Sequence, residues 1–134
     1  MDAVSLMNVF AAGLVPLFVG YAWYHPKIFG AHWVRLMRIT PEMAERGQVK
    51  RLRYSLYSIC AGVATAFVMS LVASAWDIES IPHSIGLAFL LWLGFMVPTS
   101  LGDVLWELKP SALYFIDASY WLISFIAMAL ILSL

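Results

Sequence analysis

The stretch YSLYSICAGVATAFVMSLVASAW, residues 54–76, decides the fold of this chain because it contains no Asp, Glu, Lys or Arg. About 20 apolar residues in an α-helix cross the roughly 30 Å hydrocarbon core of a membrane. Residues 3–23 and 81–102 are uncharged in the same way, and residues 111–134 carry only Asp117. We therefore expect an all-α integral membrane protein. It should be a four-helix up-down bundle with spans at about residues 3–24, 54–76, 82–105 and 111–134.

The composition agrees with a protein that has little mass outside the bilayer. The 134 residues are 63% hydrophobic and 12% charged, whereas soluble domains carry about 25% charged residues. The length leaves room for one domain, residues 1–134, and the net charge of zero gives no case for nucleic-acid binding. The single cysteine, Cys60, excludes an internal disulfide and is expected to be a buried thiol inside the second span.

The basic residues set the expected orientation. Seven of the eight Lys and Arg residues lie between the first and second spans, and the eighth, Lys109, lies between the third and fourth. Because basic connections stay in the cytoplasm, both connections should be inside and both termini outside. We expect a multi-pass protein of the inner cell membrane. Its basic residues could bind the headgroups of anionic lipids.

The long connection between the first two spans, residues 25–53, is expected to be partly helical. Thr40-Pro41-Glu42 has the pattern of a helix start, with an N-cap, a proline at the first helical position and an acid in the first turn. The helix that follows should continue through Lys50 into the second span. Upstream, residues 25–39 mix apolar and basic side chains, which predicts a helical segment lying in the membrane interface.

Glycine and proline residues inside the spans are expected to shape the helix contacts. Gly13, Gly20, Gly94 and Gly102 should let neighbouring backbones approach closely. Pro98 removes a backbone donor from the third span and should kink it.

Four short motifs carry a resemblance to a known family. The first is GYAWYHPKIFGAHW at residues 20–33, and the others are TPEM at 40–43, WLGF at 92–95 and IDASYW at 116–121. Together they resemble the DUF1761 family. The resemblance implies a small bacterial four-helix membrane protein, and it brings no known reaction, cofactor or catalytic residue. The most specific motif residues are Gly20, Trp23, Tyr24, Pro26, Gly30 and Trp33.

Aromatic residues of the first motif are expected near the inner membrane surface. Trp23, Tyr24 and Trp33 lie close to the inner end of the first span, where Trp and Tyr commonly sit at headgroup level. We expect these three side chains to act as anchors.

Asp117 is the one charged residue inside the otherwise uncharged last span, and its presence there needs an explanation. It lies about six residues into the last span, or roughly 9 Å deep. A carboxylate there costs about 2.5–3.5 kcal/mol unless it is paired, hydrated or protonated. Helical spacing places Tyr114, Tyr120 and Trp121 on the same side, so that the two hydroxyls could reach the carboxylate.

A matching stripe on the third span contains Trp92, Thr99 and Asp103. If Asp103 faces Asp117, the two carboxylates would titrate as a unit and form a proton- or cation-handling site. The alternative is structural. Asp117 then accepts hydrogen bonds from Tyr or Trp groups, or pairs with a basic residue of the inner connection, and locks the bundle. Trp92 and Trp121 would then serve mainly in packing.

Three classes of function fit these features. The first is small-solute or proton- or cation-linked transport by a homo-oligomer through the Asp117 region. The second is a non-catalytic accessory or scaffold subunit that binds other membrane proteins or lipids. The third, a membrane enzyme, lacks any Ser-His-Asp, Cys-His or metal constellation, and His25 and His32 form no metal-binding pattern. We favour transport over scaffolding and expect no catalytic residue, metal or cofactor.

Overall fold

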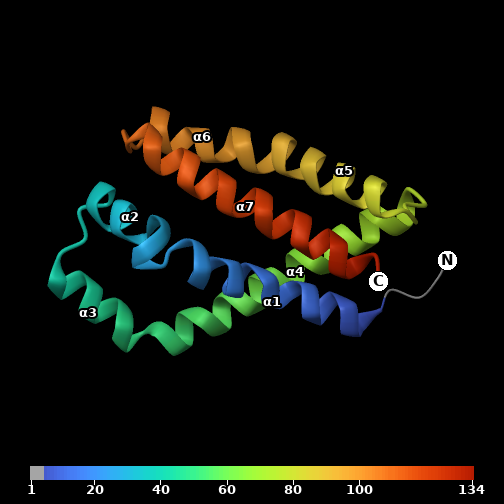
Figure 1. Ribbon diagram of the computed structural model, residues 1–134, viewed down its shortest axis with the longest axis horizontal. Coiled ribbons are helices and arrows are strands. Elements are labelled where there is room, and N and C mark those ends of the chain that lie inside the picture. The colour runs from blue at the N-terminus through green and yellow to red at the C-terminus, as the bar shows by residue number, and fades with distance from the viewer. Residues whose placement is uncertain (1–4) are drawn as a thin grey trace.

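The four long apolar helices predicted from the sequence are present in the computed structural model, which describes residues 5–134 and contains no strand in that range (Figure 1). Each is long and apolar enough to cross a membrane. Residues 3 and 4, at the start of the expected first span, lie outside the described residues. The helices are α1 (Leu6–Trp23), α4 (Arg51–Ala75), the continuous α5–η2–α6 helix (Ile81–Leu105) and α7 (Ser111–Leu132).

The second long helix begins earlier than its uncharged stretch. The structure starts α4 at Arg51 instead of residue 54, because the Tyr54 N–H already donates to the Lys50 carbonyl over 3.0 Å. An uncharged stretch shows only which part of a helix is apolar. The helical hydrogen bonds of the backbone extend beyond that part into the neighbouring polar residues. The expected continuation from Thr40 through Lys50 is wrong, because Lys50 has φ −94° and ψ 1° and separates two helices.

The connection between α1 and α4 is built from short helical pieces. They are the π-helical turn η1 (Pro26–Gly30), α2 (Ala31–Leu36) and α3 (Pro41–Val49). The predicted N-cap of α3 is confirmed, since Thr40 Oγ1 accepts from the Met43 N–H over 3.3 Å. No residue of α3 is buried, so its exposed polar surface gives it no packing reason to stay in line with α4.

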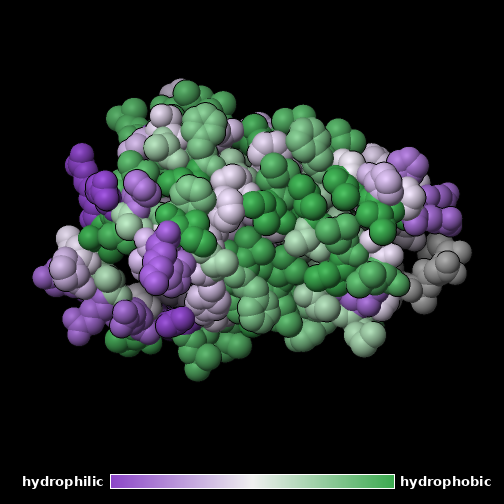
Figure 2. All heavy atoms as spheres, viewed as in Figure 1, coloured by the Kyte–Doolittle hydropathy of each residue, from purple (hydrophilic) through white to green (hydrophobic). Residues whose placement is uncertain are grey.

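Successive long helices run in opposite directions and form two hairpins (Figure 1). α1 packs against α4, and α7 packs against α5, η2 and α6, while the α1–α7 contact joins the hairpins. The connections at residues 24–50 and 106–110 lie at one end of the molecule, which we call the basic end. Hydrophilic side chains gather at both ends, and a hydrophobic belt lies between them (Figure 2).

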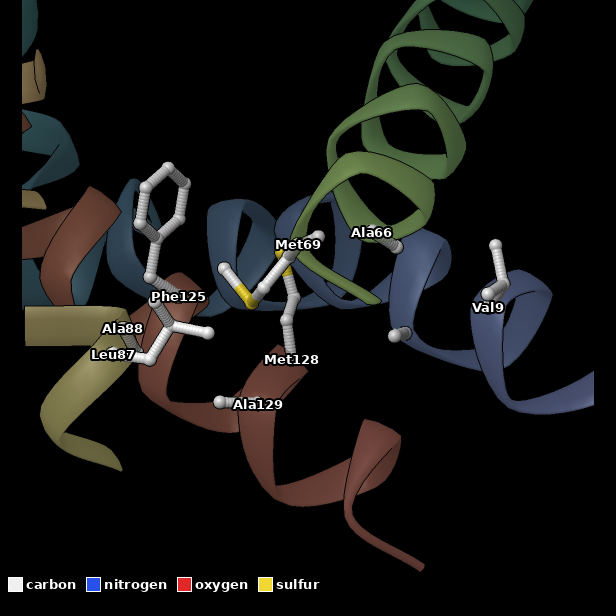
Figure 3. Packing of buried hydrophobic residues seen from close by; sticks show 9 residues of the cluster. Val9, Ala66, Met69, Leu87, Ala88, Phe125, Met128 and Ala129 are labelled. Atoms are coloured by element: carbon white, nitrogen blue, oxygen red, sulfur yellow. The ribbon is translucent and has the colours of Figure 1, made fainter. Parts of the chain in front are cut away.

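The closely packed core lies in the half of the molecule away from the basic end, and Figure 3 shows its side chains from close by. Every long helix contributes to it, with Val9, Ala12, Ala66, Met69, Leu87, Ala88, Phe125, Met128 and Ala129 as its buried members. Met128 and Ala12 are completely excluded from solvent. The helices are therefore held together tightly at this end, and the larger clefts with polar lining lie toward the basic end.

Small residues bring α1 and α4 into backbone contact. A Cβ added to Gly13 would lie 2.5–2.7 Å from atoms of Val63, and one added to Gly62 would overlap the Gly13 carbonyl. The expected close approach at Gly13 is confirmed, with Gly62 as its unpredicted partner. The expectation is wrong for Gly94 and Gly102, where an added Cβ would meet nothing within 4 Å. These two residues face away from the neighbouring helices.

Pro98 is accommodated by a wider helical turn. The Val97 N–H donates to the Trp92 carbonyl, five residues back, within η2 (Trp92–Met96), and α6 (Val97–Leu105) follows directly. A proline ring clashes with the carbonyl four residues before it in a regular α-helix. A π-helical turn relieves such a clash by displacing that carbonyl. The interruption expected at Pro98 is therefore a local widening of the α5–η2–α6 helix.

Cys60 lies on the outside of the helix pair. The expectation of a buried thiol is wrong, since this side chain is exposed on α4. The buried side of α4 carries Gly62, Ala66 and Met69, and Cys60 falls outside that stripe.

Candidate functional site

A cleft of about 550 Å³ opens at the basic end between α2, α6 and α7. Its lining combines aromatic rings with charged groups. The residues that carry the argument are Tyr24, Trp33, Asp103, Lys109, Asp117 and Trp121. Residues far apart in the sequence thus meet in one cleft, as the sequence-based site hypothesis requires of Asp103, Asp117 and Trp121.

Asp117 is held by a tyrosine from the first hairpin. The Tyr24 hydroxyl donates to Asp117 Oδ1 over 2.6 Å, a short charge-assisted bond. The Tyr24 ring packs against Trp33 and Tyr120, with centroids 5.8 and 5.3 Å away. Tyr24 therefore packs into the bundle, because its hydroxyl is directed to α7 and the residue is half-buried; its expected position at headgroup level stays a prediction.

The second carboxylate oxygen of Asp117 stays available. Tyr24 supplies the only side-chain hydrogen bond to Asp117 within residues 5–134, and Asp117 lines the cleft. A carboxylate has about four acceptor sites, so one bond leaves most of its capacity unused. The cleft therefore offers an acceptor for a proton, a cation or a donor group of a solute.

Asp103 lies at the mouth of the same cleft. It does not face Asp117 as an isolated pair of carboxylates, because Lys109 lies beside it. Its carboxylate is 3.5 Å from Lys109 Nζ and its side chain is 52% exposed. Lys109 Nζ also lies 2.7 Å from the Glu107 carboxylate. The hydrogen bond to Glu107 raises the pKa of Lys109, which stays charged at neutral pH. The lining thus carries two carboxylates and one ammonium group.

The other predicted hydroxyl donors bind elsewhere. Tyr114 lines the cleft as expected, but its hydroxyl donates to the Val97 carbonyl over 3.3 Å; Tyr120 lies outside this cleft and donates to the Pro16 carbonyl over 2.8 Å. Both were expected to reach Asp117, which lies on the same helix, but a long phenol side chain extends to the neighbouring helix instead. Thr99 is exposed and donates to carbonyls of its own helix, including that of Met96 at 3.1 Å. Its expected place in the site is therefore wrong.

The family profile described as "Protein of unknown function (DUF1761)" matches residues 7–133. The chain belongs to the DUF1761 family. The resemblance seen in the four sequence motifs is thereby confirmed, and the matched range includes every residue of the cleft. No curated protein and no solved structure matches the chain.

Two tryptophans of this DUF1761 protein also bind the backbone of α7. Trp23 Nε1 donates to the Ile116 carbonyl over 3.1 Å, and Trp92 Nε1 donates to the Ala118 carbonyl over 2.7 Å. These bonds flank Asp117 in sequence and satisfy the indole N–H groups inside the bundle. Trp92 thus serves in positioning α7, whereas Trp121 lines the cleft and packs edge-to-face against Phe125, with ring centroids 5.9 Å apart.

The motif at residues 20–33 explains how Tyr24 and Trp33 reach the site. A Cβ added to Gly30 would overlap the Tyr24 carbonyl, so only glycine lets η1 fold back against the end of α1. The following helix α2 then places Trp33 beside Tyr24. The glycine and aromatic spacing of the motif therefore describes one wall of the cleft. Gly20 lies nearby, with the Tyr120 ring 3.6 Å from an added Cβ.

Sequence reasoning missed Tyr24, Trp33, Ser100 and Lys109 as lining residues. Ser100 lies three residues before Asp103 on α6, so helical spacing could have found it. Tyr24 could not be found in that way, since 93 positions separate it from Asp117. No group of three or more His, Cys, Asp or Glu side chains in the described part of the chain could hold a metal ion.

Proposed function

We propose that this protein is an integral membrane protein with four spans, an up-down bundle of the inner cell membrane. The basic end faces the cytoplasm in this proposal, both termini lie outside, and residues 25–39 lie in the inner interface. Its support is the length and apolarity of the four helices, together with the position of all eight Lys and Arg residues at the basic end, six in the two connections and Arg51 and Arg53 in the first turn of α4.

We further propose that the cleft around Asp117 binds a small solute, a cation or a proton during transport. The observation that carries the proposal is the position of Asp117 and its incomplete hydrogen bonding. It lies within α7, Tyr24 binds one oxygen, and the rest of the carboxylate faces a cleft open at the basic end. An ionisable side chain inside a span is costly and commonly marks an ion or proton pathway.

The charges around the cleft favour a cationic or proton-bearing ligand. Asp103 and Asp117 outnumber Lys109 in the lining, and aromatic rings of Tyr24, Trp33 and Trp121 form its walls. Aromatic faces and a carboxylate together attract cations. The packed core at the other end would close the path in this conformation, so access is from the cytoplasmic side. No enzymatic role is proposed.

The test uses the purified protein in liposomes that contain a pH-sensitive dye. A membrane potential is imposed, and proton entry is followed for the native protein, Asp117→Asn and Asp77→Asn. Asp77 is the matched control, because it lies in the opposite connection and its φ of 49° suits Asn. We expect flux in the native protein and in Asp77→Asn, and none in Asp117→Asn.

A second set of measurements distinguishes the alternatives. The melting temperature in detergent should be unchanged in Asp117→Asn if the carboxylate acts by titration. A lower melting temperature with unchanged flux would mean a structural role. Unchanged flux and unchanged stability would end the site proposal. Absence of proton flux in the native protein would restrict the cleft to solute binding, which is measured by radiolabelled cation uptake with the same variants.

One observation favours the second candidate function, that of a scaffold or accessory subunit. An apolar groove of about 490 Å³ lies between α4, η2 and α7, lined among others by Thr65, Val68, Met69, Leu91, Phe95 and Phe125. Phe95 is 67% exposed and Val68 is 57% exposed. A helix of a second copy could fill this groove. In this case the native protein should be larger than a monomer in detergent, and Val68→Trp should reduce it to a monomer.

A further inference from the structure

A second cleft lies on the other side of Tyr24 and Trp33. It has a volume of about 750 Å³ and is bounded by α1, α3 and α4. Tyr24 and Trp33 line both clefts, so their rings form the partition between them. The lining of the second cleft changes from polar to apolar along its length, and this gradient carries the inference.

The polar part lies at the basic end, where α4 begins. Arg51 lies there with Gln48, and Ser55 and Ser58 follow along α4, so that side chains able to form hydrogen bonds become sparser away from the basic end. The Arg51 guanidinium lies 5.1 Å from the centre of the Tyr21 ring, and the Tyr21 hydroxyl is 3.1 Å from Ser55 Oγ.

The charge of Arg51 is not neutralised by the protein. No carboxylate lines the cleft, and no ion pair of Arg51 occurs in the region from residue 5 onward. The guanidinium has five N–H donors, and stacking on a ring leaves them free to bind an anion. This part of the cleft is therefore suited to a phosphate or another anionic group.

The apolar part extends along α1 toward the middle of the helix. Leu17 and Pro16 line it, and Gly20 adds no side chain to fill it; a Cβ there would make an ordinary contact with the Tyr120 ring at 3.6 Å. The Pro16 carbonyl already accepts from Tyr120, so this wall offers no free polar group at that point. A soluble anion would leave this part of the cleft unfilled, whereas a hydrocarbon chain would fit it.

We propose that the second cleft binds one anionic phospholipid. Its phosphate contacts Arg51, its headgroup contacts the Gln48 side chain, and one acyl chain passes Gly20 and Ser55 and lies along α1 over Leu17 and Pro16. The order of polar and apolar lining matches that of a lipid at the inner membrane surface, because the uncharged part of α4 begins at residue 54, about one turn after Arg51. The proposal is independent of any transport through the Asp117 cleft.

The test measures lipid binding to the detergent-solubilised full chain by native mass spectrometry. The probes are a phosphatidylglycerol and a phosphatidylcholine with identical acyl chains. Arg51→Gln is compared with Arg53→Gln, which removes the same charge from the same helix about 200° around it and does not line the cleft. One basic residue near a membrane surface contributes about fivefold to anionic lipid binding. We expect at least that loss for Arg51→Gln and phosphatidylglycerol, and little change for Arg53→Gln.

Two further measurements separate the lipid from a soluble anion. Gly20→Leu should fill the apolar part of the cleft and weaken phosphatidylglycerol binding at unchanged melting temperature. Glycerol 3-phosphate, which has the headgroup chemistry without acyl chains, should fail to displace the lipid. Equal losses for Arg51→Gln and Arg53→Gln would show that only surface charge matters. Displacement by glycerol 3-phosphate, or wild-type lipid binding in Gly20→Leu, would equally overturn the lipid assignment.

Discussion

Single hydrogen bonds from aromatic side chains determine how Asp117 is presented to the cleft. Tyr24 binds one carboxylate oxygen, and the Trp23 and Trp92 indoles bind the backbone on either side of Asp117. Each donor comes from a different helix than its acceptor. The position of the carboxylate therefore depends on side chains that the local sequence of α7 does not contain.

The bond between Tyr24 and Asp117 should be measurable as a coupling energy. In a double-mutant cycle of Tyr24→Phe and Asp117→Ala, we expect a coupling of about 0.6–1.7 kcal/mol, between the average and the largest value measured for hydrogen bonds of this kind in a membrane protein. The free energy of unfolding is measured by denaturant titration in mixed micelles. Tyr57→Phe is the control, since Tyr57 is 61% exposed. A coupling near zero would show that the bond does not hold in solution.

The indole of Trp92 should contribute to stability through its N–H group. Trp92→Phe removes the donor to the Ala118 carbonyl and leaves a smaller ring, so we expect a loss of about 1–3 kcal/mol. Trp106→Phe makes the same chemical change at a side chain that is 86% exposed, and it should be neutral. Thermal unfolding in detergent compares the two. Equal melting temperatures would contradict the role given to Trp92.

For single residues, the sequence identified the unusual position of Asp117 but not the side chain that contacts it. Asp117 was predictable because a lone carboxylate in an uncharged span has to be compensated. Its partner was not, because Tyr24 belongs to another helix and local helical spacing carries no information on that distance. The same limit explains why Tyr114 and Tyr120 were assigned to Asp117, although they bind the Val97 and Pro16 carbonyls.

Pairs of helices are held by contacts that depend on size rather than polarity. α1 and α4 approach until the Gly62 backbone touches the Gly13 carbonyl. Close approach of this kind increases van der Waals contact, which drives helix association where water is absent. The first hairpin is therefore sensitive to single methyl groups.

Gly62→Ala should separate α1 from α4. The added methyl group would overlap the Gly13 carbonyl, which is backbone and cannot rotate away, so we expect a loss of about 1–3 kcal/mol. Gly86→Ala on α5 is the matched control, because an added Cβ there meets nothing within 4 Å. It should be neutral or raise stability by up to about 1 kcal/mol through helix propensity. Comparable destabilisation by both variants would refute the close contact.

At the scale of elements, the presence of the four long helices was predictable, whereas their breaks and irregular turns were not. The uncharged stretches predicted all four long helices because length and apolarity are local properties. The π-helical turn before Pro98 and the break at Lys50 depend on how a strained or unsupported turn relaxes against its surroundings. Gly94 and Gly102 show the same limit, since a glycine has the same identity whether it faces a helix or open space.

The whole molecule has a tightly packed end and an end where two polar clefts open. The proposed orientation is tested with single cysteines in a Cys60→Ala background, which is needed because Cys60 is exposed. Glu45→Cys on α3 should react with an impermeant maleimide only from the cytoplasm. Glu79→Cys should react only from outside, and it leaves the Ser80 cap of α5 intact. The reverse labelling pattern would invert the topology.

The arrangement in two hairpins has a consequence for how the protein is made. The α1–α4 pair can form by its glycine contact while the rest of the chain is still being synthesised, and α5, α6 and α7 are consecutive in the chain. If the helices span a membrane as proposed, the Tyr24, Trp23 and Tyr120 bonds then join two units that are already inserted. We expect fragments divided between Asp77 and Ile81, produced separately in one cell, to recombine in the membrane into a protein that melts as one unit.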